Sequence, residues 1–366
     1  ALLIPIGVAW WLRETLRPSG QTKADLAATI FLLSPINVVT FLHTTDTSLL
    51  AFTMLAGALA LAAERRKSSV LWLLAGFFLG LAFLAKYFAV LIGLAWAVWQ
   101  LTKRPRSRWR PVLLVLIGAT PAVAMNILWN HAHGWTNVLF NVMTRNSTAG
   151  VNLVTPLLYP LFWAFVLGPA LMMLVVRGVR RHGWRESWNR LQQGVDRGVL
   201  FMAVVPVVVF GAVALVQDVG LHWLLAFAPW VMLAVLAAAP EKELARTIRP
   251  AVAYAGMLVA FLMAACLAPT DWLRNNKNHA SVIVARYADE VVAALEPYRS
   301  DYLLVSPSYA RAALLAYHFG VEVPVFGPGS FHGRQDDLLT DFRALNGRNL
   351  MLLSERDRKG MVHPWF

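Results

Sequence analysis

The residues best suited to chemistry lie in four short polar linkers, each set between long apolar stretches. The linkers are His43-Thr44-Thr45-Asp46, a turn at Lys86, Trp129-Asn130-His131-Ala132-His133-Gly134-Trp135, and Gln217-Asp218-Val219-Gly220-Leu221-His222-Trp223. Ionisable side chains close to a hydrocarbon boundary are costly, and they are therefore functional candidates by default. Together these linkers supply a cation, carboxylates, imidazoles and aromatic rings, a set suited to binding a polar or anionic substrate.

Each of these residues also has a simpler interpretation. The tryptophans Trp129, Trp135 and Trp223 are typical of the aromatic belt at a membrane surface. Lys86 could extend its ammonium group to the lipid headgroups, and Asp46 could cap a helix that starts at Thr47.

A metal site is a further alternative. His43, His133, His222 and Asp46 are the candidate ligands, so a divalent metal is a possible cofactor. No ligand spacing supports this set, so the sequence assigns no cofactor with certainty.

The composition of the chain identifies the setting in which these residues act. Of the 366 residues, 58% are hydrophobic and 14% are charged, whereas a soluble domain has about 45–50% and 25%. This excludes a disordered chain and argues against an ordinary cytosolic enzyme. Cys266 is the single cysteine, which excludes an intrachain disulfide. The sequence has no Walker A loop, GxSxG, HExxH or dinucleotide fingerprint, which argues against an ATP-driven pump.

Apolar runs long enough to cross a membrane divide the chain into nine or ten expected spans. They are an incomplete run at 1–12, then 25–43, 47–63, 69–85, 87–102, 111–129, 154–176, 199–217, 222–239 and 251–268. Alternate linkers, at 13–25, 64–68, 103–110, 177–198 and 240–250, hold 20 Lys and Arg residues. The opposite linkers before the tail hold only Lys86 and Arg145.

This asymmetry predicts that the basic linkers face the cytoplasm. It requires 69–85 and 87–102 to form a hairpin that turns at Lys86. It also accounts for the net charge of +13 without a nucleic-acid partner. The protein is expected to be a multi-pass protein of the inner (plasma) membrane.

The composition changes at about Asp271, and this gives two expected domains, 1–270 in the membrane and 271–366 soluble. The tail has 11 basic and 11 acidic residues and no spanning segment. Strands are predicted at 302–306, 323–326 and 349–353, with helices at 309–319 and 336–345 between them. A β-α-β-α-β order predicts a small α/β domain with a parallel sheet, which the last span leaves on the extracytoplasmic side.

Four segments carry a family resemblance. They are Asp46-Thr-Ser-Leu-Leu-Ala-Phe, Leu73 to Tyr87, Leu128 to Trp135, and His222-Trp223. They resemble the membrane glycosyltransferases that use polyprenyl-phosphate sugars, in the branch of the protein O-mannosyltransferases and the aminoarabinose transferase of lipid A. The resemblance covers about residues 1–270 and implies the GT-C type of fold, an all-α polytopic membrane protein. The tail resembles the small extracytoplasmic domain of such bacterial proteins.

The resemblance also implies roles for individual residues. Lys86 would bind the donor phosphate, and Asp46 would hold hydroxyl groups or orient the reacting group. The other substrate-binding candidates are His43, Asn130, His133, His222 and Trp223. The partners implied are a polyprenyl-phosphate sugar as donor, membrane lipids, and a lipid, glycan or protein as acceptor.

In the family an acidic residue of the first outer loop serves as catalytic base. Its counterpart is expected upstream of Ala1, so no residue here is given that role, and this stretch is expected to be inactive alone. The expected reaction is an inverting glycosyl transfer at the outer face of the membrane. The alternatives are a transporter or flippase of a lipid-linked sugar and a scaffold membrane protein.

Overall fold

The computed structural model describes residues 3–40, 45–103, 105–144, 150, 154–274, 279–307, 309–326 and 340–353. The chain forms two compact units. Unit 1 comprises Ala1–Leu128 and Ala149–Met263, and unit 2 comprises Trp129–Thr148 and Ala264–Phe366. Each unit is described separately below.

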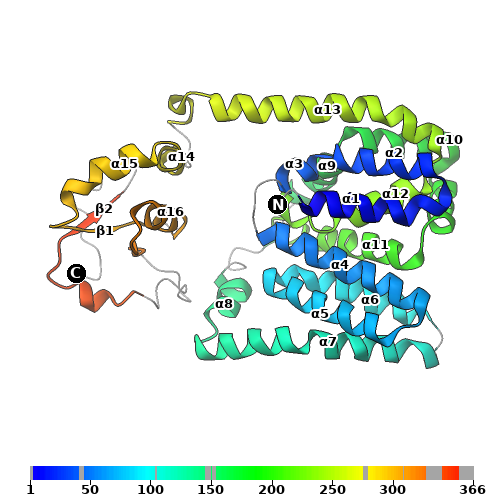
Figure 1. The fold of residues 1–366 in the computed structure, drawn as a ribbon, viewed down its shortest axis with the longest axis horizontal. Helices are drawn as coiled ribbons and strands as arrows, with labels where there is room; N and C mark the ends of the chain where they lie inside the picture. Colours follow the sequence, from blue (N-terminus) through cyan, green and yellow to red (C-terminus); the bar gives the residue numbers. More distant parts are fainter. Residues whose placement is uncertain are drawn as a thin grey trace. The chain divides into compact units, whose positions relative to one another are not determined.

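Unit 1 is a bundle of helices whose axes lie roughly side by side (Figure 1). Its helices, of which the seventh and the last continue into unit 2, are α1 (Leu3–Leu16), α2 (Gln21–Leu32), α3 (Pro35–Thr40), α4 (Thr45–Arg66), α5 (Ser69–Ala85), α6 (Val90–Leu101), α7 (Pro105–Ala132), α9 (Val154–Leu167), α10 (Pro169–Gly194), α11 (Arg197–Val213), α12 (Ala228–Ala238) and α13 (Glu241–Leu267).

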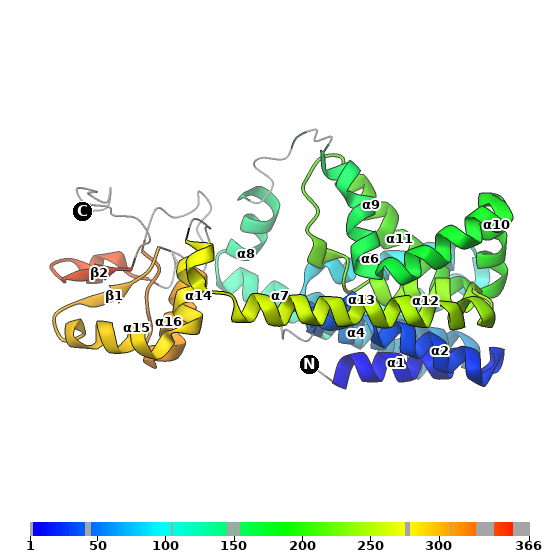
Figure 2. The same cartoon turned by 90° about the horizontal axis from the view of Figure 1, so that it is seen from above.

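These helices confirm an all-α polytopic membrane protein, with fewer full-length spans than the hydropathy pattern predicts. Within the described ranges, α4, α7 and α13 are long and apolar enough to cross a membrane. The helices α9 and α10 pass the same test only as a pair bent by 110°, which makes a fourth span if the two are counted as one, and Figure 2 shows α10 turning away from α9. Helices α5, α6, α11 and α12 are apolar but shorter. At 1.5 Å per residue, a helix of 17 residues covers about 26 Å of a core about 30 Å thick.

Two of the expected spans are interrupted where a proline disfavours helical geometry in the preceding residue. The run 25–43 breaks before Pro35, so that α2 ends at Leu32 and α3 begins at Pro35. The run 154–176 breaks at Gly168, whose φ of 82° lies in the left-handed region. Because hydropathy is averaged over many residues, it does not detect such breaks. The hydropathy pattern therefore predicted one continuous span where the structure has two helices.

Close backbone approaches hold the bundle together. A Cβ at Gly76 of α5 would lie 2.2 Å from the carbonyl oxygen of Val115 on α7, and one at Gly118 would lie 2.1 Å from that of Leu73. Gly80 continues the same α5 face against Ala122. This confirms the packing role that the small-xxx-small spacing of Gly76 and Gly80 predicts.

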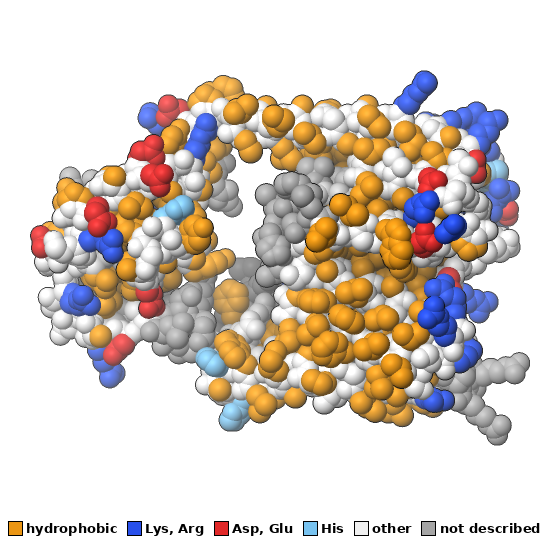
Figure 3. Space-filling view, in the orientation of Figure 1, with side chains coloured by type: hydrophobic (Ala, Val, Ile, Leu, Met, Phe, Trp, Pro, Cys, Tyr) orange, Lys and Arg blue, Asp and Glu red, His pale blue; other side chains and the backbone are white. Residues whose placement is uncertain are grey.

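The basic linkers of the sequence gather at one end of unit 1, where Figure 3 shows a concentration of Lys and Arg side chains beside a largely hydrophobic lateral face. Contacts between distant segments fix this end: Lys103 to Glu64 at 2.7 Å, Arg110 to Ser69 at 2.6 Å, Lys23 to the carbonyl of Ala237 at 2.6 Å, and Arg181 to Glu243 at 3.0 Å. We call it the basic end. Which face of the membrane it meets stays a prediction.

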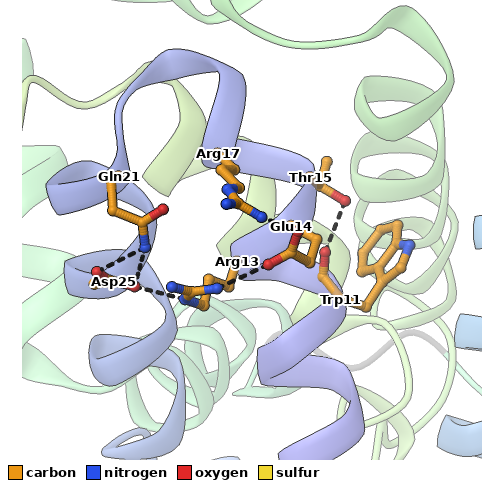
Figure 4. Close-up of polar contacts among 7 residues, drawn as sticks. All are labelled: Trp11, Arg13, Glu14, Thr15, Arg17, Gln21 and Asp25. Carbon is orange, nitrogen blue, oxygen red and sulfur yellow. Dashed lines mark hydrogen bonds and ion pairs between the residues drawn. The ribbon is translucent and has the colours of Figure 1, made fainter.

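At the basic end, the corner between α1 and α2 is held by a polar network (Figure 4). Arg13 donates to Asp25 at 2.6 Å and Gln21 donates to the same carboxylate at 3.0 Å. Glu14 accepts from Arg13 and Arg17. The hydrogen bonds from Gln21, followed by that from Arg13, lower the pKa of Asp25.

Unit 2 contains α8 (Thr136–Leu139), α14 (His279–Arg286), α15 (Ala288–Leu295) and α16 (Tyr309–Phe319), with strands β1 (Leu303–Val305) and β2 (Leu350–Leu352). The strands are parallel, with Leu303 opposite Leu350, and α16 matches its prediction.

The third predicted strand, 323–326, is reduced to one parallel bridge between Ser306 and Val325. Of the predicted helix 336–345, the described part forms a 3-10 turn at Phe342–Leu345; residues 336–339 lie outside the described ranges.

Candidate functional site

Lys86 and Asp46, forty residues apart, form an ion pair at the end of unit 1 opposite the basic end. Helix α5 ends at Ala85, and Lys86 adopts an extended conformation (φ −165°, ψ 135°) before a 3-10 turn and α6. Its Nζ lies 2.6 Å from Oδ1 of Asp46. The predicted turn at Lys86 is therefore confirmed, and it places the ammonium group against the start of α4.

The contact gives Asp46 a role other than the helix cap that was its simpler interpretation. Helix α4 begins at Thr45, so Asp46 lies within its first turn and not before a helix starting at Thr47. The side chain of Asp46 is 11% exposed and that of Lys86 is 21% exposed. A carboxylate is favoured at the positive end of the helix dipole, and here it also holds the lysine in place.

The geometry leaves Lys86 able to bind a second anion. An ammonium group has three N–H donors, and the contact with Asp46 uses one of them. The ammonium also lies 5.6 Å from the ring centre of Phe88. The partial exposure of Lys86 gives an anionic ligand access to the remaining donors.

An aromatic cluster continues from this pair to the last of the four polar linkers. The rings of Phe88 and Trp223 lie 4.5 Å apart, and Phe210 lies 5.8 Å from Trp223. Trp223 is 6% exposed, so its ring is a packing element. His222 is exposed and meets Trp223 edge to face at 6.4 Å. The structure thus brings together Asp46, Lys86 and Trp223, with His222 beside them.

Sequence reasoning missed two residues of this end. Phe88 connects Lys86 to Trp223, but nothing distinguishes it from the other apolar residues of its run. Asn126 of α7 donates to the hydroxyl of Tyr87 at 3.4 Å. An amide inside an otherwise apolar span was the signal that could have identified Asn126.

Asn130 and His133 belong to unit 2, where Asn130 lies in the last turn of α7 and His133 begins the turn that follows this helix. The carbonyl of Asn130 accepts from the backbone N–H of Trp135 at 2.8 Å. The ring of His133 stacks on Trp129 at 4.2 Å, and Trp135 has a left-handed φ of 59°. The segment is therefore an ordered unit. His43, the remaining candidate, lies outside the described residues.

The conceivable metal site is not assembled by the residues that the structure describes. Among them, no three His, Cys, Asp or Glu side chains come close enough to hold an ion. Asp46 forms its ion pair with Lys86 instead. His43, another of the four proposed ligands, lies outside the described residues.

An apolar cavity of about 400 Å³ lies between α5, α6 and α7. Phe83 and Val90, which flank the Lys86 turn, line it, and so do Gln100 and Val112 nearer the basic end. Gln100 is 2% exposed, and within the described part of the chain neither polar atom of its amide has a hydrogen-bond partner. The lining of the cavity thus reaches from the residues that flank the Lys86 turn to residues nearer the basic end.

Comparison with known proteins gives one family match. Residues 2–129, about a third of the chain, match the dolichyl-phosphate-mannose-protein mannosyltransferase family. No curated protein and no solved structure matched the chain. The matched segment includes Asp46, Lys86 and the three helices around the apolar cavity, and it supports a membrane glycosyltransferase of the GT-C type that uses a polyprenyl-phosphate sugar.

Proposed function

We propose that the protein transfers a sugar from a polyprenyl phosphate to a hydroxyl group of a lipid, glycan or protein acceptor, with inversion at the anomeric carbon. The observation that carries this proposal is the Lys86–Asp46 pair. It lies at the end of unit 1 away from the basic end, beside an aromatic cluster, and within the segment that matches the family.

Lys86 would bind the phosphate that links sugar and prenyl chain. This group carries one negative charge in the donor, and it gains charge as the sugar–oxygen bond breaks. An ammonium group preorganised by Asp46 would stabilise that developing charge more than the ground state, which is the requirement for catalysis. The second oxygen of Asp46 would accept a hydrogen bond from a hydroxyl group of the sugar or of the acceptor.

Two further candidates of unit 1, His222 and Trp223, would act beside this pair. The exposed ring of His222 is suited to donate to phosphate or hydroxyl oxygens, while Trp223, packed between Phe88 and Phe210, would support it. We keep His43, Asn130 and His133 as proposed substrate-binding residues. The acceptor hydroxyl needs a general base, which we assign to no residue of this chain.

The apolar cavity would hold the first part of the prenyl chain. Phe83 and Val90, which flank the Lys86 turn, line it together with other hydrophobic side chains of α5, α6 and α7. A phosphate on Lys86 would therefore place the attached chain close to the cavity. Burial of its methylene groups would contribute about 0.8 kcal/mol each.

We further propose that the Lys86 end faces outward from the inner membrane and that residues 271–366 form an extracytoplasmic α/β domain. The support is the charge asymmetry of the linkers, because the basic linkers gather at one end of unit 1 and Lys86 lies at the other. The donor's sugar would then be presented on the outer face.

The test is retention and turnover of a polyprenyl-phosphate sugar by the purified protein. We expect native mass spectrometry to show one bound donor, lost in Lys86→Ala and kept in Lys67→Ala, a control at the basic end that is 79% exposed. Formation of a glycosylated acceptor with release of polyprenyl phosphate identifies the transferase. Equal donor retention by both variants contradicts the proposal.

The bend of 110° between α9 and α10 favours the second candidate, a flippase, because discontinuous helices are common in transporters. Reconstituted vesicles distinguish the two functions. A flippase moves the lipid-linked sugar across the bilayer and leaves the sugar–phosphate bond intact.

A further inference from the structure

A second cavity lies at the basic end, far along the bundle from the Lys86–Asp46 pair, and nothing in the proposed function uses it. It has a volume of about 720 Å³ and lies between α10 and α13. Its polar lining consists of Arg177, Arg181, Lys242, Glu243, Arg246 and Arg249. Five cations and one carboxylate therefore face a common space.

Glu243 organises two of these cations. Its side chain is 9% exposed, and its Oε1 accepts from Arg181 at 3.0 Å and from Arg246 at 2.9 Å. This contact joins α10 to α13 and fixes two guanidinium groups at the cavity wall. A charge-assisted pair of this kind has a defined geometry, unlike a set of solvated surface cations.

The remaining cations have no such neutralisation. Within the described ranges, no hydrogen bond or ion pair joins the side chains of Arg177, Lys242 or Arg249 to another residue. Elsewhere at this end, Lys67 and Lys103 share Glu64, and Arg13 pairs with Asp25. The cavity therefore has a positive potential that an anion would relieve.

An apolar cavity of about 250 Å³ adjoins this basic cavity, because Arg177, Arg181 and Glu243 line both. Its other walls include the hydrophobic side chains of Leu174, Trp188, Leu191 and Val235, together with His182, Ser187 and Arg190. Trp184, which is 69% exposed, stands at its edge. Tryptophan at the level of lipid headgroups is typical of a membrane interface.

From these two cavities we infer that the basic end holds an anionic phospholipid of the adjacent leaflet. Its phosphate lies among Arg177, Lys242 and Arg249, and the start of an acyl chain lies against Trp188 and Leu191. The two features of the ligand, a phosphate and an attached apolar chain, match the two adjoining cavities. Basic pockets between helices on the cytoplasmic side are suited to such headgroups. The inference does not depend on the sugar-transfer activity.

The test uses the full chain in nanodiscs or detergent, with dioleoyl phosphatidylglycerol and dioleoyl phosphatidylcholine as probes. Native mass spectrometry counts the lipid retained, and a thermal melt records its stabilising effect. We expect retention of the anionic lipid over the neutral one, weakened about 30-fold in the double variant Arg177→Gln/Arg249→Gln. The control Arg65→Gln/Arg66→Gln removes the same charge from another basic linker and should leave retention unchanged.

A second pair of arms separates the lipid from a soluble phosphate. Inorganic phosphate and glycerol 3-phosphate, at the same concentration as the lipid, should not reproduce the stabilisation because they cannot fill the apolar cavity. Trp188→Ala should weaken lipid retention while the protein keeps its melting behaviour without lipid. Equal stabilisation by inorganic phosphate, or equal lipid loss in the control variant, would overturn the inference. Lys242→Gln, at an exposed position, gives an independent variant if the double variant does not fold.

Discussion

At the scale of single residues, the partial burial of Lys86 and Asp46 makes each dependent on the other. Their side chains are 21% and 11% exposed, so removing one leaves the other charge poorly solvated and without its partner. When one partner of an ion pair at the basic end, such as Lys67 with Glu64, is removed, the loss of stability is much smaller because water solvates the remaining charge.

The first prediction concerns the ammonium group. Lys86→Ala should weaken binding of a polyprenyl phosphate by about 10- to 150-fold, corresponding to the about 1.5–3 kcal/mol of a charged hydrogen bond. Lys86→Arg should be intermediate, because a planar guanidinium does not reproduce the point charge of an ammonium. Titration with the labelled lipid measures both variants. Wild-type affinity in Lys86→Ala would favour the simpler interpretation, in which Lys86 extends its ammonium group to the lipid headgroups.

The second prediction separates the charge of Asp46 from a purely local role at the start of α4. Asp46→Ser keeps a small polar residue that is favoured near helix starts but removes the charge that holds Lys86. We therefore expect Asp46→Ser to lose donor affinity while the protein still inserts and gives a normal elution profile. If the serine variant binds donor as the wild type does, Asp46 contributes only to the helix start.

At the scale of elements, α5 is the helix on which the site most depends. It ends at the Lys86 turn, and its glycine face allows α7 to approach closely enough to form the apolar cavity. Helix α6 completes the wall of that cavity with Val90, Gly93 and Gln100.

The third prediction tests this approach. Gly76→Ala should destabilise the protein by about 1–3 kcal/mol, because its Cβ would lie 2.2 Å from the carbonyl oxygen of Val115. Gly93→Ala is the matched control, since its Cβ would lie 3.4 Å from Leu79 in ordinary contact. Melting in detergent should show a lower midpoint for Gly76→Ala alone. An equal shift in both variants would attribute the loss to the residue type and not to the α5–α7 contact.

The fourth prediction concerns the corner between α1 and α2. The pKa of Asp25 is lowered in the folded protein by Gln21 and Arg13, so its contribution to stability is present above its unfolded pKa of about 3.9. The contribution is lost as the pH falls through the folded pKa. The effect is small because the carboxylate is exposed.

We therefore expect Asp25→Asn to melt slightly below the wild type at pH 7, with the difference closing as the pH falls below about 4. Melting curves across this range provide the measurement. A difference that stays constant with pH would show that the asparagine acts through packing and not through charge.

At the scale of the whole molecule, charge is divided between the two ends of unit 1. The basic linkers meet at one end through contacts such as Lys103 with Glu64, and the candidate site lies at the other. If the basic end of unit 1 faces the cytoplasm, Lys86 lies at the outer face of the membrane.

The fifth prediction tests this orientation with an impermeant thiol reagent. The exposed Cys266 is first replaced by serine, and single cysteines are introduced as Arg180→Cys and Tyr317→Cys. Tyr317 is 82% exposed and belongs to the tail. In intact cells Tyr317→Cys should be labelled, and Arg180→Cys only after permeabilisation. Labelling of Arg180→Cys in intact cells would reverse the assignment.

The sequence by itself determined the properties that depend on local composition. Hydropathy established an all-α membrane protein, the positions of Lys and Arg predicted one basic end, and the spacing of charge required the turn at Lys86. The alternation of short strands and a helix in the tail likewise predicted the parallel pairing of β1 with β2. Each of these follows from residues that are neighbours in the chain.

The tertiary structure decided which distant residues meet. Asp46 and Lys86 were separate candidates until the packing of α4 against α5 brought their side chains to 2.6 Å. Trp223 is a candidate substrate-binding residue of the sequence, and the fold packs its ring against Phe88 and Phe210. The breaks at Pro35 and Gly168 and both cavities also depend on how helices pack. Hydropathy and spacing act along the chain, whereas such contacts form between helices far apart in sequence, so only the fold could determine them.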